Sequence, residues 1–134
     1  MTLSADERVA QVSKARSVLE DMISDPLEAT LILGSGLGGL VETIKPENVM
    51  EYRQIPGFAI STAPSHAGRL IIGELGGRRV GIMQGRMHLY EGWSPIDIAL
   101  PIRVLRTLGA TRLVVTNAAG ALNTDFDPGD VMQI

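Results

Sequence analysis

The stretch Ala29-Thr30-Leu31-Ile32-Leu33-Gly34-Ser35-Gly36-Leu37-Gly38-Gly39 decides the fold class. Its first part, residues 29–33, is a short and mainly apolar run that ends directly at a glycine-rich loop. Such a run predicts a strand buried on both faces, as in the parallel part of an α/β sheet. Because open α/β sheets bind ligands at the carboxyl ends of their strands, the loop that follows is the first expected ligand site.

One helix is expected before this strand in the sequence and another after it. Ser4 followed by Glu7 fits a capping box, which predicts the start of an amphipathic helix. A stripe of mainly apolar residues continues from it at helical spacing over residues 9–23, and we expect this stripe to be core. A second, short helix is expected after the glycine loop.

The rest of the chain predicts more strands and one long helix. Two strand-like runs, 69–75 and 78–84, are joined by Gly76-Gly77, which supplies the positive φ angles of a tight hairpin turn. Ser94-Pro95 predicts the start of a helix over residues 96–108. The remaining expected elements are a strand at 112–116, a turn at 127–129 and the beginning of a strand at 130–134. This order predicts the α/β class, with a mixed central β-sheet flanked by helices.

Composition narrows the classes of function. The chain has 134 residues, a formal net charge of -3 and no block of like charge that would follow nucleic acid or an acidic membrane surface. No segment reaches the roughly 18 apolar residues of a membrane span, and the absence of cysteine excludes disulfides and thiolate zinc sites. The only histidines, His66 and His88, lack the spacing of paired helical metal ligands. We therefore expect a cytoplasmic protein that binds a small molecule, and no metal, nucleic acid or membrane.

Three glycine-containing loops carry the candidate chemistry. The loops at 34–39, 85–92 and 117–120 each follow an expected strand, so parallel strands would bring them to one edge of the sheet. The first loop offers backbone N–H groups and the Ser35 hydroxyl, which together can wrap a phosphate. Arg86 adds a permanently charged fork that matches two phosphate oxygens. We interpret the three loops as one anion site.

The second loop carries further polar groups. His88 would be a second donor, two positions after Arg86, with a charge that depends on pH. Glu91 could hold the His88 imidazole in one tautomer, and Tyr90 could bring a hydroxyl to a polyol such as ribose. Each residue also has an ordinary interpretation: the glycine turn as plain geometry, Arg86 as a surface charge and His66 as a solvated loop residue. Their order and spacing together favour a site.

These residues resemble the trimeric, low-molecular-mass purine nucleoside phosphorylases, the family that includes inosine-guanosine phosphorylase. The resemblance extends over roughly residues 31–134. It rests on Leu33-Gly34-Ser35-Gly36-Leu37-Gly38, Ile55-Pro56-Gly57-Phe58, His66-Ala67-Gly68-Arg69-Leu70, Gln84-Gly85-Arg86 with His88, Tyr90, Glu91 and Gly92, and Val114-Val115-Thr116-Asn117-Ala118-Ala119-Gly120. It implies a nucleoside phosphorylase-like fold and a phosphorolysis in which a purine (deoxy)ribonucleoside and phosphate give the free base and (deoxy)ribose 1-phosphate.

The same resemblance implies roles for individual residues, with phosphate as a co-substrate and no cofactor. The residues implied for phosphate are Ser35, Arg86, His88, the backbone N–H of Ala118 and, on a loop that closes over the site, His66. Tyr90 is expected to lie against the sugar. His88 and Glu91 are expected to act in catalysis, with Glu91 supporting His88 from behind.

Members of the family are much longer than this chain. We therefore expect residues 1–134 to be the N-terminal portion of a single phosphorylase domain, with the C-terminal half and its purine-gripping groups absent. The purine preference is then not readable, and the homotrimer of the family is expected for the full-length protein. Apolar surface and open strand edges are also expected on this portion.

Two other interpretations stay open. Gly34-x-Gly36-x-x-Gly39 also has the spacing of a dinucleotide-binding loop in an oxidoreductase, with Glu51 about where a ribose-binding acid belongs. Pro46 counts against this interpretation, because it would cut short the long helix that should follow such a loop. The other interpretation is a non-catalytic remnant that binds phosphate or assembles with other chains.

Overall fold

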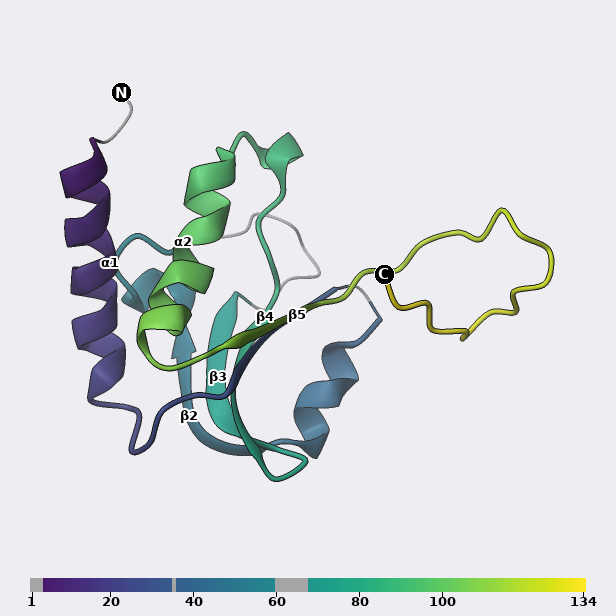
Figure 1. Cartoon of the computed structure of the whole chain (residues 1–134), viewed down its shortest axis with the longest axis horizontal. Coiled ribbons are helices and arrows are strands. Elements are labelled where there is room, and N and C mark those ends of the chain that lie inside the picture. The colour runs from purple at the N-terminus through teal and green to yellow at the C-terminus, as the bar shows by residue number, and fades with distance from the viewer. Residues whose placement is uncertain (1–3, 35, 60–67) are drawn as a thin grey trace.

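The computed structural model describes residues 4–34, 36–59 and 68–134. These residues form helices packed around one five-stranded sheet (Figure 1). In chain order the elements are α1 (Ala5–Glu20), β1 (Ala29–Leu33), the 3₁₀ helix η1 (Gly38–Thr43), β2 (Lys45–Glu51), the 3₁₀ helix η2 (Tyr52–Gln54), β3 (Arg69–Leu75), β4 (Arg78–Gln84), the 3₁₀ helix η3 (Leu89–Glu91), α2 (Pro95–Thr107) and β5 (Arg112–Val115). The strand order is β2-β3-β4-β1-β5, and the predicted mixed sheet is confirmed.

The sheet is mixed because its strands pair in both directions. β1 runs parallel to β4 on one side and to β5 on the other, whereas β3 is antiparallel to β2 and β4. The predicted hairpin is confirmed: Leu75 pairs with Arg78, and the two intervening residues, Gly76 and Gly77, have φ angles of 58° and 75°. The carboxyl ends of β4, β1 and β5 consequently lie at one edge of the sheet.

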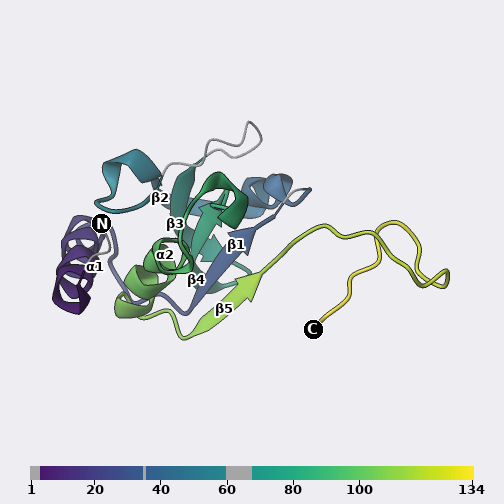
Figure 2. The same ribbon diagram turned by 90° about the horizontal axis from the view of Figure 1, so that it is seen from above.

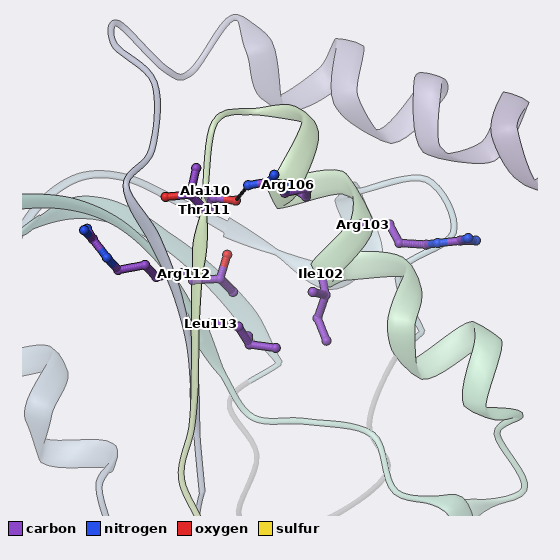
Figure 3. Close-up of a pocket in the computed structure, with 8 residues that line it drawn as sticks. Ile102, Arg103, Arg106, Ala110, Thr111, Arg112 and Leu113 are labelled. Atoms are coloured by element: carbon purple, nitrogen blue, oxygen red, sulfur yellow. Dashed lines mark hydrogen bonds between the residues drawn. The ribbon is translucent and has the colours of Figure 1, made fainter.

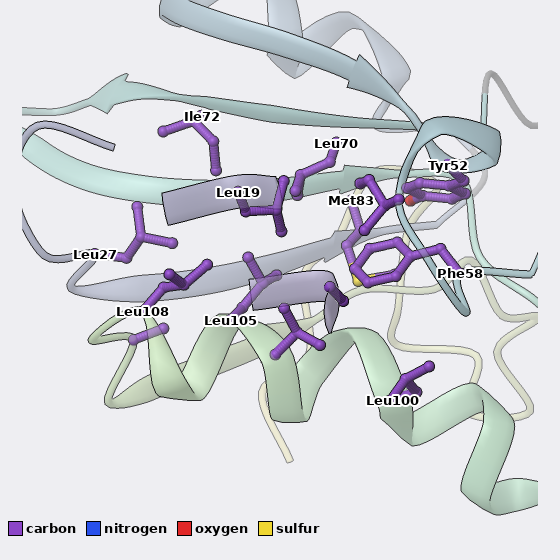
Figure 4. Packing of buried hydrophobic residues seen from close by; sticks show 14 of the residues in the cluster. Leu19, Leu27, Tyr52, Phe58, Leu70, Ile72, Met83, Leu100, Leu105 and Leu108 are labelled. Atoms are coloured by element: carbon purple, nitrogen blue, oxygen red, sulfur yellow. The ribbon is translucent and has the colours of Figure 1, made fainter. Parts of the chain in front are cut away.

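Both α-helices cover the same face of the sheet, over the larger core cluster (Figures 2 and 4). α1 contributes Leu19 and α2 contributes Leu105, and both are fully buried. Gly81 of β4 faces this layer, and a Cβ there would lie 3.2 Å from the side chains of Leu105 and Leu27. Glycine at this position therefore lets the α2 layer approach the sheet closely.

The helix starts follow the predicted caps. In α1 the Ser4 hydroxyl accepts the N–H of Glu7 at 3.2 Å, while the Ser4 N–H donates to the Glu7 carboxylate at 2.7 Å. The Ser94 hydroxyl likewise accepts the N–H of Asp97 at the start of α2. These reciprocal bonds satisfy N–H groups that the first turn of a helix leaves without partners.

The opposite face of the sheet has a smaller core. Its buried residues are Leu33, Ile44, Ile71, Val80 and Ile82, with Leu40 and Val41 of η1 packed against them. The short helix expected after the glycine loop is thus present as a 3₁₀ helix. It is the element that covers this face within the described part of the chain.

Two expectations differ from the structure, and one strand was not expected. Val9 is 66% exposed, because α1 contacts the body through the face that carries Ala15 and Leu19, so the apolar stripe is core only in part. Residues 130–134 form no strand, since no neighbouring strand in the described residues offers them a ladder of hydrogen bonds. The structure instead has a strand, β2, that the sequence did not predict.

β2 also bears on the dinucleotide interpretation. Pro46 is tolerated there because β2 is an edge strand with an irregular register between Pro46 and Asn48. Glu51 ends this strand, which pairs antiparallel with β3 and is separated from β1 by two strands. A ribose-binding acid belongs at the end of a second parallel strand beside β1, so Glu51 does not occupy that place.

No helix among the described residues is long and apolar enough to span a membrane.

Candidate phosphate and nucleoside site

The three predicted loops begin at the same edge of the sheet. β1 ends at Leu33, β4 at Gln84 and β5 at Val115, and the parallel register of these strands aligns their carboxyl ends. Segments of the other two strands join them, because η2 directly follows β2 and Gly68 directly precedes β3. The N–H of Gly68 donates to the carbonyl oxygen of Gln84 at 3.0 Å. This edge therefore collects chain segments from all five strands.

Gly34 and Thr116 hold the first and third loops together. The N–H of Gly34, which is buried, donates to the Thr116 hydroxyl at 2.9 Å. The same hydroxyl donates to the carbonyl oxygen of Ile32 at 3.2 Å. A Cβ on Gly34 would lie 2.4 Å from the Thr116 carbonyl oxygen, so the backbone approach here requires glycine.

Arg86 joins the second loop to the same point. Its Nη1 donates to the carbonyl oxygen of Thr116 at 2.8 Å, and its side chain is partly buried. The guanidinium is thereby fixed between the carboxyl ends of β4 and β5, beside the glycine loop of β1. A fixed, permanently charged fork beside a glycine loop is suited to bind an oxyanion.

Tyr52 supports the Arg86 loop from inside the core. Its hydroxyl donates to the carbonyl oxygen of Gly85 at 2.7 Å, and its N–H donates to the carbonyl oxygen of Gly68 at 2.8 Å. The ring is buried and meets Phe58 edge to face, with centroids 5.7 Å apart (Figure 4). Burial raises the pKa of the Tyr52 phenol well above its ordinary value, so the hydroxyl stays protonated and remains a donor.

His88, Tyr90 and Glu91 form a second group just beyond Arg86. The N–H of His88 donates to the Glu91 carboxylate at 2.8 Å, and the N–H of Glu91 donates to the His88 carbonyl oxygen at 3.1 Å. The rings of His88 and Tyr90 are stacked, with centroids 4.8 Å apart and an angle of 16° between their planes. Tyr90 is 79% exposed, so a flat hydrophobic and hydroxyl-bearing surface faces solvent beside the imidazole.

This second group lies on an open hollow. The hollow has a volume of about 630 Å³ and is lined by Met87, His88, Leu89, Tyr90, Pro95 and Ile98. A separate hollow of about 240 Å³ lies between the end of α2 and the start of β5, where Arg106 donates to the carbonyl oxygen of Ala110 (Figure 3). This smaller hollow borders the amino end of β5, whereas the three loops follow the carboxyl ends of the strands. It therefore lies apart from the three loops.

The structure describes five of the seven predicted site residues. Arg86, His88, Tyr90 and Glu91 lie in one continuous segment at the sheet edge, and Ala118 lies on the exposed segment that follows Thr116. Ser35 and His66 lie outside the described residues. The structure therefore brings Arg86 to the start of the Ala118 loop through Thr116.

Two residues at this edge escaped the sequence analysis. Thr116 was part of a motif, but no role was assigned to it, since its contacts come from residues far away in the chain. Tyr52 follows the unpredicted strand β2, and nothing in its neighbours pointed to Gly85. A polar residue directly after an apolar strand, at the start of a glycine-containing loop, is the signal that could have found Thr116.

A comparison with protein-family models matches residues 29–134 to the phosphorylase superfamily. This chain belongs to that superfamily. The match begins at β1 and includes all five strands and the three loops of the sheet edge.

Individual superfamily members agree with this assignment. The chain is 50% identical over 107 residues to the purine nucleoside phosphorylase of Bos taurus, which covers 80% of this chain and 37% of the bovine protein. It is 44% identical over 123 residues to purine nucleoside phosphorylase 1 of Geobacillus stearothermophilus, covering 92% of this chain and 45% of that protein. The chain thus spans less than half the length of these relatives.

A solved structure shares the same fold. Isoform 2 of the purine nucleoside phosphorylase from Schistosoma mansoni, in complex with cytosine and ribose-1-phosphate, superposes with a TM-score of 0.81 and 41% sequence identity. The superposition covers 90% of this chain and 42% of the Schistosoma chain. The fold described above is therefore the nucleoside phosphorylase fold.

Proposed function

We propose that the edge formed by the loops after β1, β4 and β5 binds inorganic phosphate, and that the protein carrying this segment is a purine nucleoside phosphorylase, a pentosyltransferase of purine salvage. One observation carries the proposal: Gly34, Arg86 and Thr116 converge in hydrogen bonds at the ends of three parallel strands. The guanidinium matches the charge and two oxygens of a phosphate, and in this proposal further N–H groups of the glycine loop complete the site.

The proposed reaction needs a phosphate held rigidly beneath the sugar. An oxygen of phosphate attacks the anomeric carbon of the ribose while the bond from that carbon to the purine nitrogen breaks and its electron pair leaves with the base. Positive charge builds on the ribose as this bond stretches. A fixed anion below the ring stabilises that charge more in the transition state than in the ground state.

The residues have distinct roles in this proposal. Arg86 and His88 hold phosphate, together with Ser35, the N–H of Ala118 and, from its loop, His66. Tyr90 lies against the sugar, which agrees with its exposed ring stacked on His88. Glu91 supports His88 through the backbone hydrogen bond at 2.8 Å.

The remaining parts of the proposal concern the whole protein. Its substrates are a purine nucleoside and phosphate, and it uses no cofactor. The groups that select the purine belong to the part of a phosphorylase domain that lies beyond residues 1–134. We also propose that the full-length protein is a cytoplasmic homotrimer.

The decisive experiment measures release of hypoxanthine from inosine with and without inorganic phosphate. Turnover that requires phosphate is the expected result for the protein carrying this segment. Turnover that is equal without phosphate would contradict phosphorolysis. With the 134-residue chain alone, thermal stabilisation by phosphate without turnover would favour the non-catalytic, phosphate-binding interpretation. No effect of phosphate on either measurement would overturn the proposed site.

A further inference from the structure

Thr116 occupies the point where the three loops meet. Its hydroxyl accepts the Gly34 N–H at 2.9 Å and donates to the Ile32 carbonyl oxygen at 3.2 Å. Its own N–H donates to the same Ile32 oxygen at 3.0 Å, and its carbonyl oxygen accepts from Arg86 at 2.8 Å. A single residue therefore contacts the β1 strand end, the glycine loop and the guanidinium from the β4 loop.

We infer that Thr116 is the positioning residue of this site: it sets the placement of the glycine loop relative to Arg86 without touching the ligand itself. The inference rests on the proposed phosphate site and adds a residue to it. The Asn117–Gly120 loop starts directly at Thr116, so the same residue also fixes where the third loop begins.

The hydroxyl is required because of the direction of its hydrogen bonds. Its one proton is directed to the Ile32 carbonyl oxygen, so a lone pair is left for the Gly34 N–H. If the hydroxyl were removed, Ile32 would keep the N–H of Thr116 as a donor, but the buried Gly34 N–H would lose this acceptor. A buried N–H without an acceptor is costly, so the glycine loop would move to find another.

The carbonyl oxygen couples this loop to Arg86. The oxygen that accepts from Arg86 is also the atom that a Cβ on Gly34 would approach to 2.4 Å. The glycine loop and the guanidinium are thus packed against the same peptide group. A displacement of Gly34 consequently changes the distance between the glycine loop and the guanidinium, which the proposed phosphate must bridge.

The test compares two substitutions at Thr116 with one remote control. Thr116→Val keeps the shape of the side chain and removes the hydroxyl, whereas Thr116→Ser keeps the hydroxyl. Thr107→Val removes a hydroxyl that donates to the Val104 carbonyl oxygen at 2.7 Å on α2, away from the three loops. Affinity for inorganic phosphate is measured by titration calorimetry on each chain, and amide hydrogen exchange at Gly34 is followed by NMR.

The expected result separates positioning from general stability. Thr116→Val should weaken phosphate binding about three- to tenfold, the scale of one hydrogen bond, and should speed exchange of the Gly34 amide. Thr116→Ser should restore both, and Thr107→Val should leave both unchanged. In the protein with turnover, Thr116→Val should raise the KM for phosphate more than the KM for the nucleoside.

Each contrary result has a separate meaning. If the unsubstituted chain binds phosphate and Thr116→Val binds it equally well, the positioning role is wrong and the phosphate site stands. Equal loss of binding in Thr116→Val and Thr116→Ser would also overturn the role of the hydroxyl. If the unsubstituted chain fails to bind phosphate, the proposed function fails and the inference with it. If Thr116→Val does not fold, Thr116→Ser with unprotected Gly34 would still contradict the inference.

Discussion

Tyr52 and Gly85 are joined by a buried hydrogen bond of 2.7 Å between the phenol hydroxyl and the backbone carbonyl oxygen. The bond connects the end of the β2 region to the residue that directly precedes Arg86. Gly85 has a φ angle of 102°, which glycine adopts readily. Tyr52 therefore stabilises the turn that brings the guanidinium to the sheet edge.

Replacing this hydroxyl should cost stability. Tyr52→Phe leaves the buried carbonyl oxygen of Gly85 without this donor, and we expect the free energy of unfolding to fall by about 1–2 kcal/mol. Tyr90→Phe is the matched control, because the exposed Tyr90 should change stability by less than about 0.5 kcal/mol. Chemical denaturation at neutral pH measures both. Equal effects of the two substitutions would contradict a structural role for the Tyr52 hydroxyl.

The raised pKa of Tyr52 predicts a loss of stability at alkaline pH. The phenol stays protonated in the folded chain at a pH where it ionises in the unfolded chain, so the unfolded state binds fewer protons above about pH 10. The free energy of unfolding should then fall by up to about 1.4 kcal/mol per pH unit from this group. The stability difference between the native chain and Tyr52→Phe should shrink above pH 10. A difference that stays constant from pH 8 to pH 11 would contradict the buried phenol.

Arg86 should be the largest single contributor to phosphate binding. Arg86→Ala is expected to lower kcat/KM on the order of 10²-fold or more, as when a preorganised electrostatic donor is removed. The kcat/KM of Arg86→Lys should lie between those of the native protein and Arg86→Ala, because lysine keeps the charge and loses the planar fork. Arg103→Ala removes an equal charge from the exposed face of α2 and should have little effect. Steady-state kinetics with varied phosphate tests this, and a loss below about threefold for Arg86→Ala would exclude the role.

Gly34 should tolerate no side chain. Gly34→Ala would place its Cβ 2.4 Å from the Thr116 carbonyl oxygen, and the backbone must shift to relieve the overlap. We expect a loss of about 1–3 kcal/mol in the free energy of unfolding, together with weaker phosphate binding. Gly39→Ala is the control, because a Cβ there meets nothing within 4 Å. If thermal and chemical denaturation find the two variants equally stable, the close approach of Gly34 to Thr116 is incorrect.

The sequence predicted those parts of the fold that depend on local pattern. The apolar run at Ala29–Leu33, the Gly76-Gly77 turn and the Ser4 cap each carry their structure in a few adjacent residues, and each was confirmed. β2 was not predicted because Pro46 and several charged residues give it a composition that is unusual for a strand. It forms as an edge strand because it pairs with β3. The residues at 130–134 have the pattern of a strand but lack a neighbour in the described chain.

The same distinction holds for the site. Sequence placed Arg86 and the three loops at strand ends, because strand direction alone brings those ends together. The role of Thr116 depends on its contact with Gly34, which is 82 residues away in the chain, and on the position of one hydroxyl proton. Tyr52 reaches Gly85 across 33 residues. Such contacts follow from tertiary packing, which neither spacing nor composition expresses.

The two outer strands of the sheet, β2 and β5, differ in how well they are protected against pairing with another chain, and this difference predicts how the chain associates. The β2 edge carries Pro46 and charged residues, which disfavour pairing with another chain. The β5 edge presents Leu113, Val114 and Val115, all about half exposed, and its outer side faces no further strand among the described residues. A short apolar strand with unpaired backbone groups favours association with a second copy.

A single charge should therefore act differently on the two edges. Val114→Lys should reduce the concentration-dependent association of the 134-residue chain, because an ammonium on β5 would be buried by pairing. Val49→Lys adds the same charge to β2 at a similar starting exposure, 50% against 47% for Val114, and should leave association unchanged. Sedimentation velocity over a range of protein concentrations measures both variants. If Val49→Lys weakens association and Val114→Lys does not, the contact lies on β2. If the native chain stays monomeric at all concentrations, the exposed β5 strand does not drive association.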